Sequence, residues 1–500
     1  MLRGADVPVN KNTLLSLINF GKDDEPSLAV NKVSYKGEPV VAILADSEAQ
    51  ALAARKLVRI DYDPLPAVFD VEETLRQGAP VVNETYPGNY FEYHDRFDHQ
   101  KLRFGDVERG FAGADMVIEH RYQMSPIEHA PTETNGSIAA PEQNGRYVVH
   151  SCAQGLFFAL GTTAKIVDVE SNQLHFIGGT VGGGFGGKVD SLTEPLAVLG
   201  AMLTGRPVRF VLDREEEMLY GSPRGAERIY IKDGLMRDGR IVARSIRSYF
   251  DAGAYTRLSS YAAIKCTAHL PGPYWIPNVA SDVYVAYTNR CPSTAMRGFG
   301  VTAVDFALEV QMDRLAEAAS MDPMELRILN AYRDGDMKAH RRIAKNTALI
   351  ECVQVAAEKA NWPLSEQAKR ASSLAGGAGE RSQIPATPLD ARGQIGRPDT
   401  RGGPVTQVLP AGTTRIAPSK QPVMEGARDG HAAPTQVPRY EQPRYEPPRP
   451  MAPPPPPVSP PAPQTYQPAG ALPAQPPPAT PAQPQHGAVR FSSVFGTRRR

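Results

Sequence analysis

A run of glycines near the middle of the chain is the segment best suited to chemistry. Residues 182–188 read Gly-Gly-Gly-Phe-Gly-Gly-Lys and lie between an apolar stretch, 174–181, and a helix-like stretch, 192–203. Glycine loses the most backbone freedom on folding, so such a run marks a place where the backbone turns sharply and approaches another group closely. Successive N–H groups and the N-terminus of the following helix carry partial positive charge. The run therefore predicts a loop that binds an anionic ligand.

Two nucleotide-binding loops have a similar pattern. The spacing G-x-G-x-x-G within residues 182–187 fits the dinucleotide fingerprint, and Asp213 closes the next apolar run. An NAD-dependent dehydrogenase built on residues 174–213 is therefore one hypothesis. The run also nearly forms a phosphate-binding P-loop, but Val189 stands where that loop requires a magnesium-binding Ser or Thr. The P-loop interpretation is the poorer of the two.

The composition divides the 500-residue chain into a globular part and a tail. The net charge is only +1, and apolar residues recur in periodic runs up to about residue 365. From residue 366 the chain is rich in Pro, Ala, Gln and Arg and includes the run Pro453–Pro457. Too few large apolar side chains remain there to offset the entropy of ordering, so we predict a disordered tail over 366–500. Its PxxP segments leave open a protein that interacts through this tail.

Several classes of protein are disfavoured by residue types and their spacing. The four cysteines are widely spaced and form no CxxC pair: Cys152, Cys266, Cys291 and Cys352. This spacing argues against a disulfide framework, a zinc knuckle or an iron–sulfur cluster in this chain and fits a reducing cytoplasm. No apolar run is long enough to span a membrane, and no signal-peptide core opens the chain. The basic tail lacks the context of nucleic-acid binding, so we expect neither a membrane nor a nucleic-acid partner.

Helix and strand signals indicate a mixed fold. The first 75 residues contain a strand, a capped helix and a second strand, at 40–44, 47–58 and 59–62. Later helices are expected at 301–319, 323–332 and 349–360. The Asp-Gly pairs 233–234 and 238–239 predict tight turns between strands. The fold class that these signals favour is α+β.

Three segments, taken together, resemble the xanthine dehydrogenase and aldehyde oxidase family of molybdenum hydroxylases. The loop 182–188 resembles the family's molybdopterin loop, and residues 295–300, Ala-Met-Arg-Gly-Phe-Gly, resemble a second signature. Residues 33–71 look like the a/b hammerhead domain that precedes the catalytic region in this family. The three matches occur in the family's order within residues 1–365.

The resemblance implies a division into three parts. Residues 1–75 would form the hammerhead domain, and residues 76–365 the first half of a molybdopterin-binding domain. The disordered tail, 366–500, would follow. The activity implied is hydroxylation of an electron-poor carbon of a small molecule, with oxygen derived from water.

The resemblance also implies how the chain holds a molybdenum–molybdopterin cofactor. The protein would contact it mainly around the metal, through Gln154, the loop and the second signature. Gln154 would donate to an oxo group, Phe185 would pack beside the metal, and Arg297 would place a positive charge over it. The implied cofactor-binding residues are Gln154, Gly183, Gly184, Phe185, Gly186 and Arg297.

Substrate-binding residues follow from the same resemblance. Phe299 matches an aromatic residue that stacks on flat substrates, and Lys265 stands where purine-oxidising members have a substrate-holding arginine. Those members also carry a glutamate directly after the loop lysine, where this chain has Val189. Both differences argue against a purine as the substrate. Aldehydes, other N-heterocycles or an aryl thioester remain as candidate substrates.

The family's general base is the residue that the sequence does not supply. In the family, a glutamate in a GEP motif far towards the C-terminus has this role. The only such string here, 37–39, lies in the hammerhead-like segment, so we reject Glu38 and assign no catalytic residue. The resemblance then implies a truncated large subunit with a foreign tail and little turnover of its own. Electrons would leave through iron–sulfur clusters and FAD on partner subunits.

Overall fold

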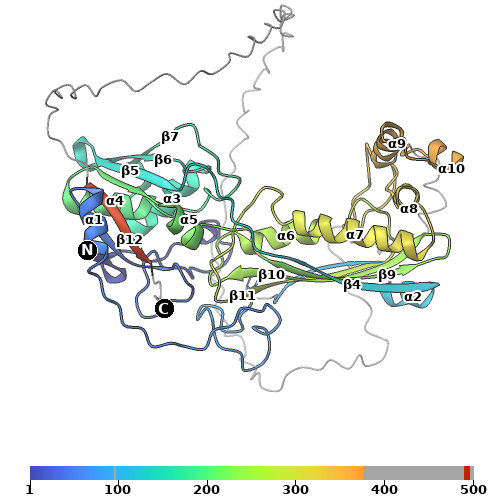
Figure 1. Ribbon diagram of the computed structural model, residues 1–500, viewed down its shortest axis with the longest axis horizontal. Coiled ribbons are helices and arrows are strands. Elements are labelled where there is room, and N and C mark those ends of the chain that lie inside the picture. Colours follow the sequence, from blue (N-terminus) through green and yellow to red (C-terminus); the bar gives the residue numbers. More distant parts are fainter. Residues whose placement is uncertain (95–96, 375–488, 496–500) are drawn as a thin grey trace, which may run out of the picture. The chain divides into compact units, whose positions relative to one another are not determined.

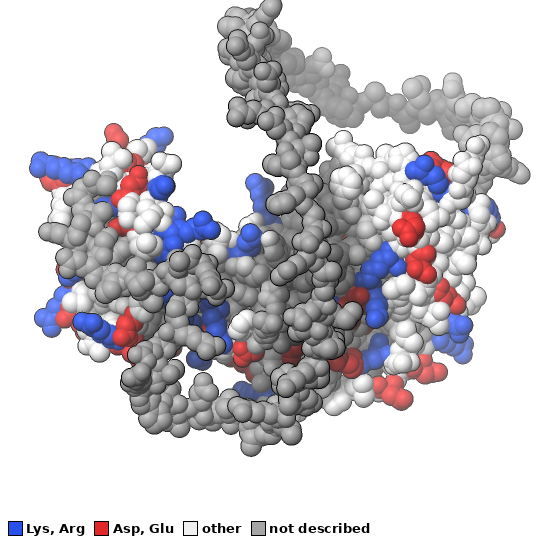
Figure 2. Space-filling model, turned by 180° about the vertical axis from the view of Figure 1, so that it is seen from behind, with Lys and Arg blue, Asp and Glu red and all other residues white. Residues whose placement is uncertain are grey.

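Two β-sheets organise the part of the chain that the structure describes. The computed structural model describes residues 1–94, 97–374 and the backbone of 489–495 (Figure 1). The remaining residues, which include most of the predicted tail, lie outside the described part. No helix within the described ranges is both long and apolar enough to cross a membrane. Acidic and basic side chains are interspersed over the face shown in Figure 2, in keeping with the net charge of +1.

The first sheet has seven strands in the order β1-β2-β12-β8-β5-β6-β7. Its strands are β1 (Leu2–Arg3), β2 (Pro39–Ala45), β5 (Gly136–Pro141), β6 (Tyr147–Ser151), β7 (Leu174–Gly178), β8 (Val208–Val211) and β12 (Val489–Phe495). The accompanying helices are α1 (Glu48–Arg55), α3 (Leu156–Val167), α4 (Glu194–Thr204) and α5 (Arg214–Tyr220). Helix α4 packs on β5 and β8, and α3 packs on α4 and β7. Residues of α4 such as Leu196 and Val198 are buried because this helix lies in the core.

The second sheet has five strands in the order β3-β11-β10-β9-β4. Its strands are β3 (Gln100–Phe104), β4 (Met116–Met124), β9 (Glu227–Leu235), β10 (Ile241–Gly253) and β11 (Val279–Tyr287). Helices α6 (Ser259–His269) and α7 (Thr302–Ala318) lie along one face of this sheet (Figure 1). Ile246 and Phe250 of β10 are therefore buried beneath helices, whereas Arg247 between them is exposed.

The remaining elements are short. They are α2 (Val107–Ala112), α8 (Pro323–Asn330), α9 (Leu349–Lys359), α10 (Glu366–Arg370) and four 3₁₀ turns, Gly4–Asp6, Leu14–Ile18, Gln143–Gly145 and Ser171–Gln173. Helix α8 begins where expected, because the Asp322 carboxylate accepts hydrogen bonds from the N–H groups of Met324 and Glu325 at 2.9 and 3.1 Å. Helix α1 begins at the predicted cap, Ser47, which accepts from Gln50 N–H. The predicted strand 40–44 and the helices at 301–319 and 349–360 are confirmed within two residues.

Three expectations from the sequence differ from the structure. Residues 59–62 form no strand, because both edges of β2 are already paired, with β1 and β12. The pair 233–234 lies inside β9 rather than in a turn, whereas 238–239 does form the turn before β10. The predicted disordered tail contains two ordered elements: α10, whose Ala368 is buried, and the strand β12. Residues 375–488 of that tail lie outside the described part.

A buried ion pair explains why Asp233 belongs to a strand. Arg244 lies opposite Asp233 in the β9–β10 ladder, and neither side chain is exposed. Arg244 Nε donates to Asp233 Oδ1 at 2.7 Å, and Gln311 Nε2 of α7 donates to Oδ2 at 3.0 Å. The carboxylate is thereby satisfied from both the sheet and the helix layer.

We expect Arg244→Met to lower the free energy of unfolding by about 3–5 kcal/mol, because Asp233 is left buried without its counter-ion. The double variant Arg244→Met with Asp233→Leu removes both charges and should regain much of that loss. Arg237→Met, which replaces an exposed arginine, is the matched control. Chemical denaturation followed by circular dichroism measures all three. A loss below about 1 kcal/mol for the single variant would contradict the account.

Candidate functional site

The glycine loop connects β7 to α4, and its glycines are required by close contacts. Gly186 adopts φ of +106°, which side chains rarely tolerate. A Cβ atom there would lie 2.5 Å from the carbonyl oxygen of Ala295. A Cβ atom on Gly184 would lie 2.5 Å from Gln154 Oε1. The loop therefore approaches both the segment after β6 and the second signature, and neither approach leaves room for a side chain.

Gln154 follows β6 and is fixed by the loop. Its Oε1 accepts a hydrogen bond from Gly186 N–H at 2.8 Å and a longer one, 3.3 Å, from Lys188 N–H. The backbone N–H of Gln154 donates in turn to the carbonyl of Lys188 at 2.8 Å. Its Nε2 group has no partner in the described part of the chain, and the side chain is exposed. Gln154 therefore presents a fixed, neutral hydrogen-bond donor beside the loop.

Arg297 is joined directly to the loop, a hundred residues away in the sequence. Its backbone N–H donates to the carbonyl of Phe185 at 2.8 Å. Phe185 itself has φ of +53° and a side chain that is 47% exposed, so its ring points away from the core. The guanidinium group of Arg297 is exposed and makes no ion pair with any described residue. The structure thus brings Gln154, Phe185 and Arg297 together.

The backbone of the loop supplies further donors. Among the described residues, no acceptor bonds to the N–H groups of three successive residues, Gly183, Gly184 and Phe185, although Gly184 is buried. Unpaired N–H groups in such a loop form a concave site for anions. With Gln154 Nε2 and the Arg297 guanidinium, these groups make a set that contains only donors. Such a set suits an anionic cofactor that carries several oxygen acceptors.

An ion pair that was not assigned from the sequence anchors the end of the loop. Lys188 is fully buried, and its Nζ lies 2.6 Å from Glu133 Oε2, which also accepts from Gly182 N–H at 2.8 Å. Burial by itself raises the pKa of Glu133, but the hydrogen bonds from Lys188 and Gly182 outweigh it and leave that pKa below its usual value. Lys188 therefore holds the loop and is not available to bind a phosphate.

Arg224 holds the backbone of the second signature, residues 295–300. The sequence alone did not identify this residue. The side chain is 6% exposed and donates to the carbonyl groups of Arg297 and Gly298. Glu227 lies nearby: burial raises its pKa to about 8, against the opposing effect of the Arg224 charge. The sequence around Arg224 carries no motif, so only the fold reveals this role.

The two residues expected to bind the substrate, Phe299 and Lys265, both lie beside the ring of Tyr261. The rings of Phe299 and Tyr261 lie 6.0 Å apart at 34° to each other, and Lys265 Nζ lies 5.5 Å from the centre of the Tyr261 ring. Val189 packs with Phe299 against the same small core. Phe299 and Lys265 are therefore on the same side of α6, linked through a tyrosine that the sequence analysis did not single out.

Other hypotheses from the sequence are resolved by the fold. Strands β7 and β8 are separated by β5 and β6, and β5 runs antiparallel to β8. Residues 174–213 are therefore not a dinucleotide-binding βαβ unit, and Asp213 instead caps α5. Glu38 is buried and bonded to Ser34 N–H and the Tyr255 hydroxyl, as expected for a structural residue. Burial raises its pKa to about 7.

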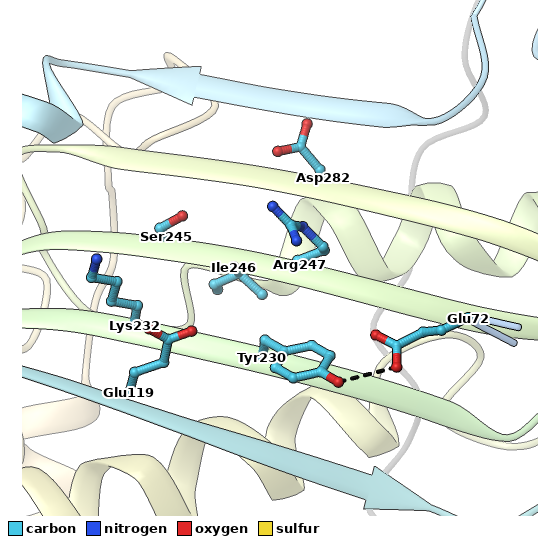
Figure 3. Close-up of a pocket in the computed structure, with 8 residues that line it drawn as sticks. All are labelled: Glu72, Glu119, Tyr230, Lys232, Ser245, Ile246, Arg247 and Asp282. Atoms are coloured by element: carbon cyan, nitrogen blue, oxygen red, sulfur yellow. Dashed lines mark hydrogen bonds between the residues drawn. The ribbon is translucent and has the colours of Figure 1, made fainter. Parts of the chain in front are cut away.

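Two hollows lie elsewhere on the described surface. The larger, about 510 Å³, is on the open face of the five-stranded sheet (Figure 3). It contains no residue of the glycine loop or the second signature. Its charges of both signs are those of the solvent-facing side of a mixed sheet, in which only β10 and β11 are parallel. The second hollow, about 240 Å³, lies beside α3 and includes Leu156 and Phe157. No group of three or more metal-ligating side chains occurs in residues 1–94 and 97–374.

Gly186→Ala should lower the free energy of unfolding by about 1–3 kcal/mol, because the new methyl group meets a backbone carbonyl at an unfavourable φ. Amide hydrogen exchange should show faster exchange across residues 182–188. Gly179→Ala is the matched control, since a Cβ atom there meets nothing within 4 Å. Equal protection of the loop in both variants would show that Gly186 does not hold this contact.

Comparison with known proteins places this geometry in a family. Residues 1–66 match "Aldehyde oxidase and xanthine dehydrogenase, a/b hammerhead domain", and residues 83–331 match "Molybdopterin cofactor-binding domain". The nicotinate dehydrogenase large molybdopterin subunit of Eubacterium barkeri is 32% identical over 67% of this chain and 78% of its own length. The xanthine dehydrogenase/oxidase of Gallus gallus is 28% identical over 68% of this chain, but only 24% of its length is covered.

Solved structures agree with the sequence matches. The aldehyde oxidoreductase of Desulfovibrio gigas superposes with a TM-score of 0.66 and 29% identity, over 73% of this chain and 41% of that chain. Quinoline 2-oxidoreductase of Pseudomonas putida gives a TM-score of 0.65 and 26% identity, over 72% and 46%. The chain thus spans less than half the length of these two proteins. It belongs to the aldehyde oxidase and xanthine dehydrogenase family and carries that family's hammerhead and molybdopterin cofactor-binding domains.

Proposed function

We propose that this chain is the molybdopterin-binding subunit of a molybdenum hydroxylase that acts on an aldehyde or an N-heterocycle. The observation that carries the proposal is the convergence of Gln154, the loop N–H groups and Arg297 into a set of donors without a described acceptor. When bound, the molybdenum cofactor supplies the oxidation of an electron-poor carbon with oxygen derived from water. The residues present fit that group, because an anionic cofactor requires donors and positive charge rather than carboxylates.

Each residue of the set has a distinct task. Gln154 offers Nε2 hydrogens that cannot act as a base, so it stabilises negative charge on an oxygen without competing for protons. The N–H groups of residues 183–185 do the same from the backbone, and the exposed ring of Phe185 shields their side of the site from water. Arg297 adds a permanent positive charge, and Arg224 fixes the backbone of the turn that carries it through the carbonyl groups of Arg297 and Gly298.

Electron transfer and the general base require partners in this proposal. The four cysteines are all free and include no cluster-binding pair, so iron–sulfur clusters and FAD would reside on partner subunits. No glutamate among the described residues lies in the position of a family base, because the only GEP string contains the buried Glu38. We therefore propose that the isolated chain binds the cofactor weakly and turns over little.

Two variants of Gln154 test the proposal. Gln154→Glu keeps an oxygen that accepts from Gly186 N–H but loses the donor, whereas Gln154→Leu loses both. We expect both variants to reduce substrate hydroxylation by the assembled enzyme by about 10²–10³-fold. Only Gln154→Leu should also loosen the loop in hydrogen exchange, and molybdenum content measured by mass spectrometry reports cofactor retention. Unchanged molybdenum content and unchanged hydroxylation in Gln154→Glu would refute the role, and a wild-type enzyme without molybdenum would refute the function.

A further inference from the structure

A buried histidine lies where the glycine loop meets the second signature. The side chain of His129 has no exposed surface. Its Nε2 atom lies 2.9 Å from the carbonyl oxygen of Ala295, and because that oxygen can only accept a hydrogen bond, Nε2 carries a hydrogen. The same carbonyl oxygen is the atom that a Cβ atom on Gly186 would meet at 2.5 Å. His129 thus bonds the turn at the atom that the loop approaches.

The imidazole ring of His129 also lies against the loop itself. A Cβ atom on Gly187 would lie 2.9 Å from His129 Nδ1 and 3.1 Å from its Cγ, so the ring packs on the bare backbone of this glycine. Nδ1 has no hydrogen-bonding partner among the described residues, and Glu128 Oε1 lies 3.7 Å from it, beyond hydrogen-bonding distance. One side chain therefore contacts both segments of the site, and its hydrogen bond goes to the turn.

His129 belongs to the connection between the two sheets. Residues 125–135 link β4 of the five-stranded sheet to β5 of the seven-stranded sheet. In this connection Ile127 N–H donates to the carbonyl of Arg224 at 3.3 Å, and Arg224 N–H donates to the carbonyl of Ile127 at 2.8 Å. Further along the same connection, Glu133 accepts from the first N–H group of the loop at 2.8 Å. The connection therefore supports the turn and the loop together, with His129 between the two supports.

We infer, building on the proposed function, that His129 is a positioning residue that fixes the second signature against the glycine loop. Its hydrogen bond holds the carbonyl of Ala295, two residues before Arg297, so that Arg297 N–H stays bonded to the carbonyl of Phe185. The Arg297 charge and the free N–H groups of the loop then remain one set of donors. Loss of the His129 bond leaves a buried carbonyl without a donor, which costs more than a hydrogen bond normally contributes. His129 takes no part in the chemistry itself.

Three substitutions of His129 separate the hydrogen bond from simple packing. The side-chain amide of His129→Gln reaches as far as Nε2 and can still donate to Ala295, whereas that of His129→Asn reaches only as far as Nδ1. His129→Leu packs in the same space without any donor. Amide hydrogen exchange of the full chain, with any subunits that copurify, follows Arg297 N–H, whose bond to Phe185 reports the contact. Exchange there should be about tenfold faster in the Asn and Leu variants and within about twofold of the wild type in His129→Gln.

His99→Leu is the matched control, because it removes another buried histidine, which is bonded to Asp282 of β11 at 2.9 Å. It should leave the exchange of Arg297 N–H unchanged, and the amides of β10 gauge any loss of overall stability in each variant. In the assembled enzyme, molybdenum content measured by mass spectrometry should fall in His129→Asn and be retained in His129→Gln.

Equal exchange of Arg297 N–H in the Gln and Asn variants would overturn the inference, as would full molybdenum content in His129→Asn. A wild-type enzyme without molybdenum would instead contradict the proposed function. The exchange of Arg297 N–H would still decide whether His129 holds the turn against the loop, because this measurement requires no bound cofactor.

Discussion

A single backbone hydrogen bond, from Arg297 N–H to the carbonyl of Phe185, fixes the relation between the two segments of the site. The loop follows β7 of the seven-stranded sheet, whereas the turn that contains Arg297 precedes α7, which packs on the five-stranded sheet. The bond therefore joins parts of the chain that belong to different sheets. The contact of Gly186 with Ala295 lies beside it and allows no side chain between the two backbones. This close approach brings the free N–H groups of residues 183–185 near Arg297.

Such a loop is strained, and the structure holds it from several directions. Phe185 adopts a left-handed backbone conformation, which costs free energy for a residue other than glycine and persists only where the surroundings determine it. Lys188 and Glu133 hold one end of the loop, and Gln154 accepts from two of its N–H groups. On the other side, Arg224 holds the carbonyl groups of the turn. The donors that remain free are thus pre-organised, so a ligand does not have to order them.

Local signals in the sequence predicted the elements better than they predicted the supports of the site. Helices α1 and α8 begin at their expected caps because capping depends on residues only two or three positions apart. The glycine run and the family resemblance led to the loop and to Arg297. Glu133 and Arg224 could not be assigned in this way, because their partners are 55 and 73 residues away. The Asp-Gly pair 233–234 is the opposite case. Its residue types predict a turn, but the ion pair between Asp233 and Arg244 across β9 and β10 places it in a strand.

The charged residues near the site belong to different elements and have different partners. Arg297 adjoins the loop through its backbone N–H, whereas Lys265 of α6 lies beside Tyr261. Of the acids near the loop and the turn, Glu133 is paired with Lys188, and burial raises the pKa of Glu227 to about 8. The loop N–H groups and the charge of Arg297 therefore meet little competing negative charge from these two acids, which favours an anionic ligand at the loop.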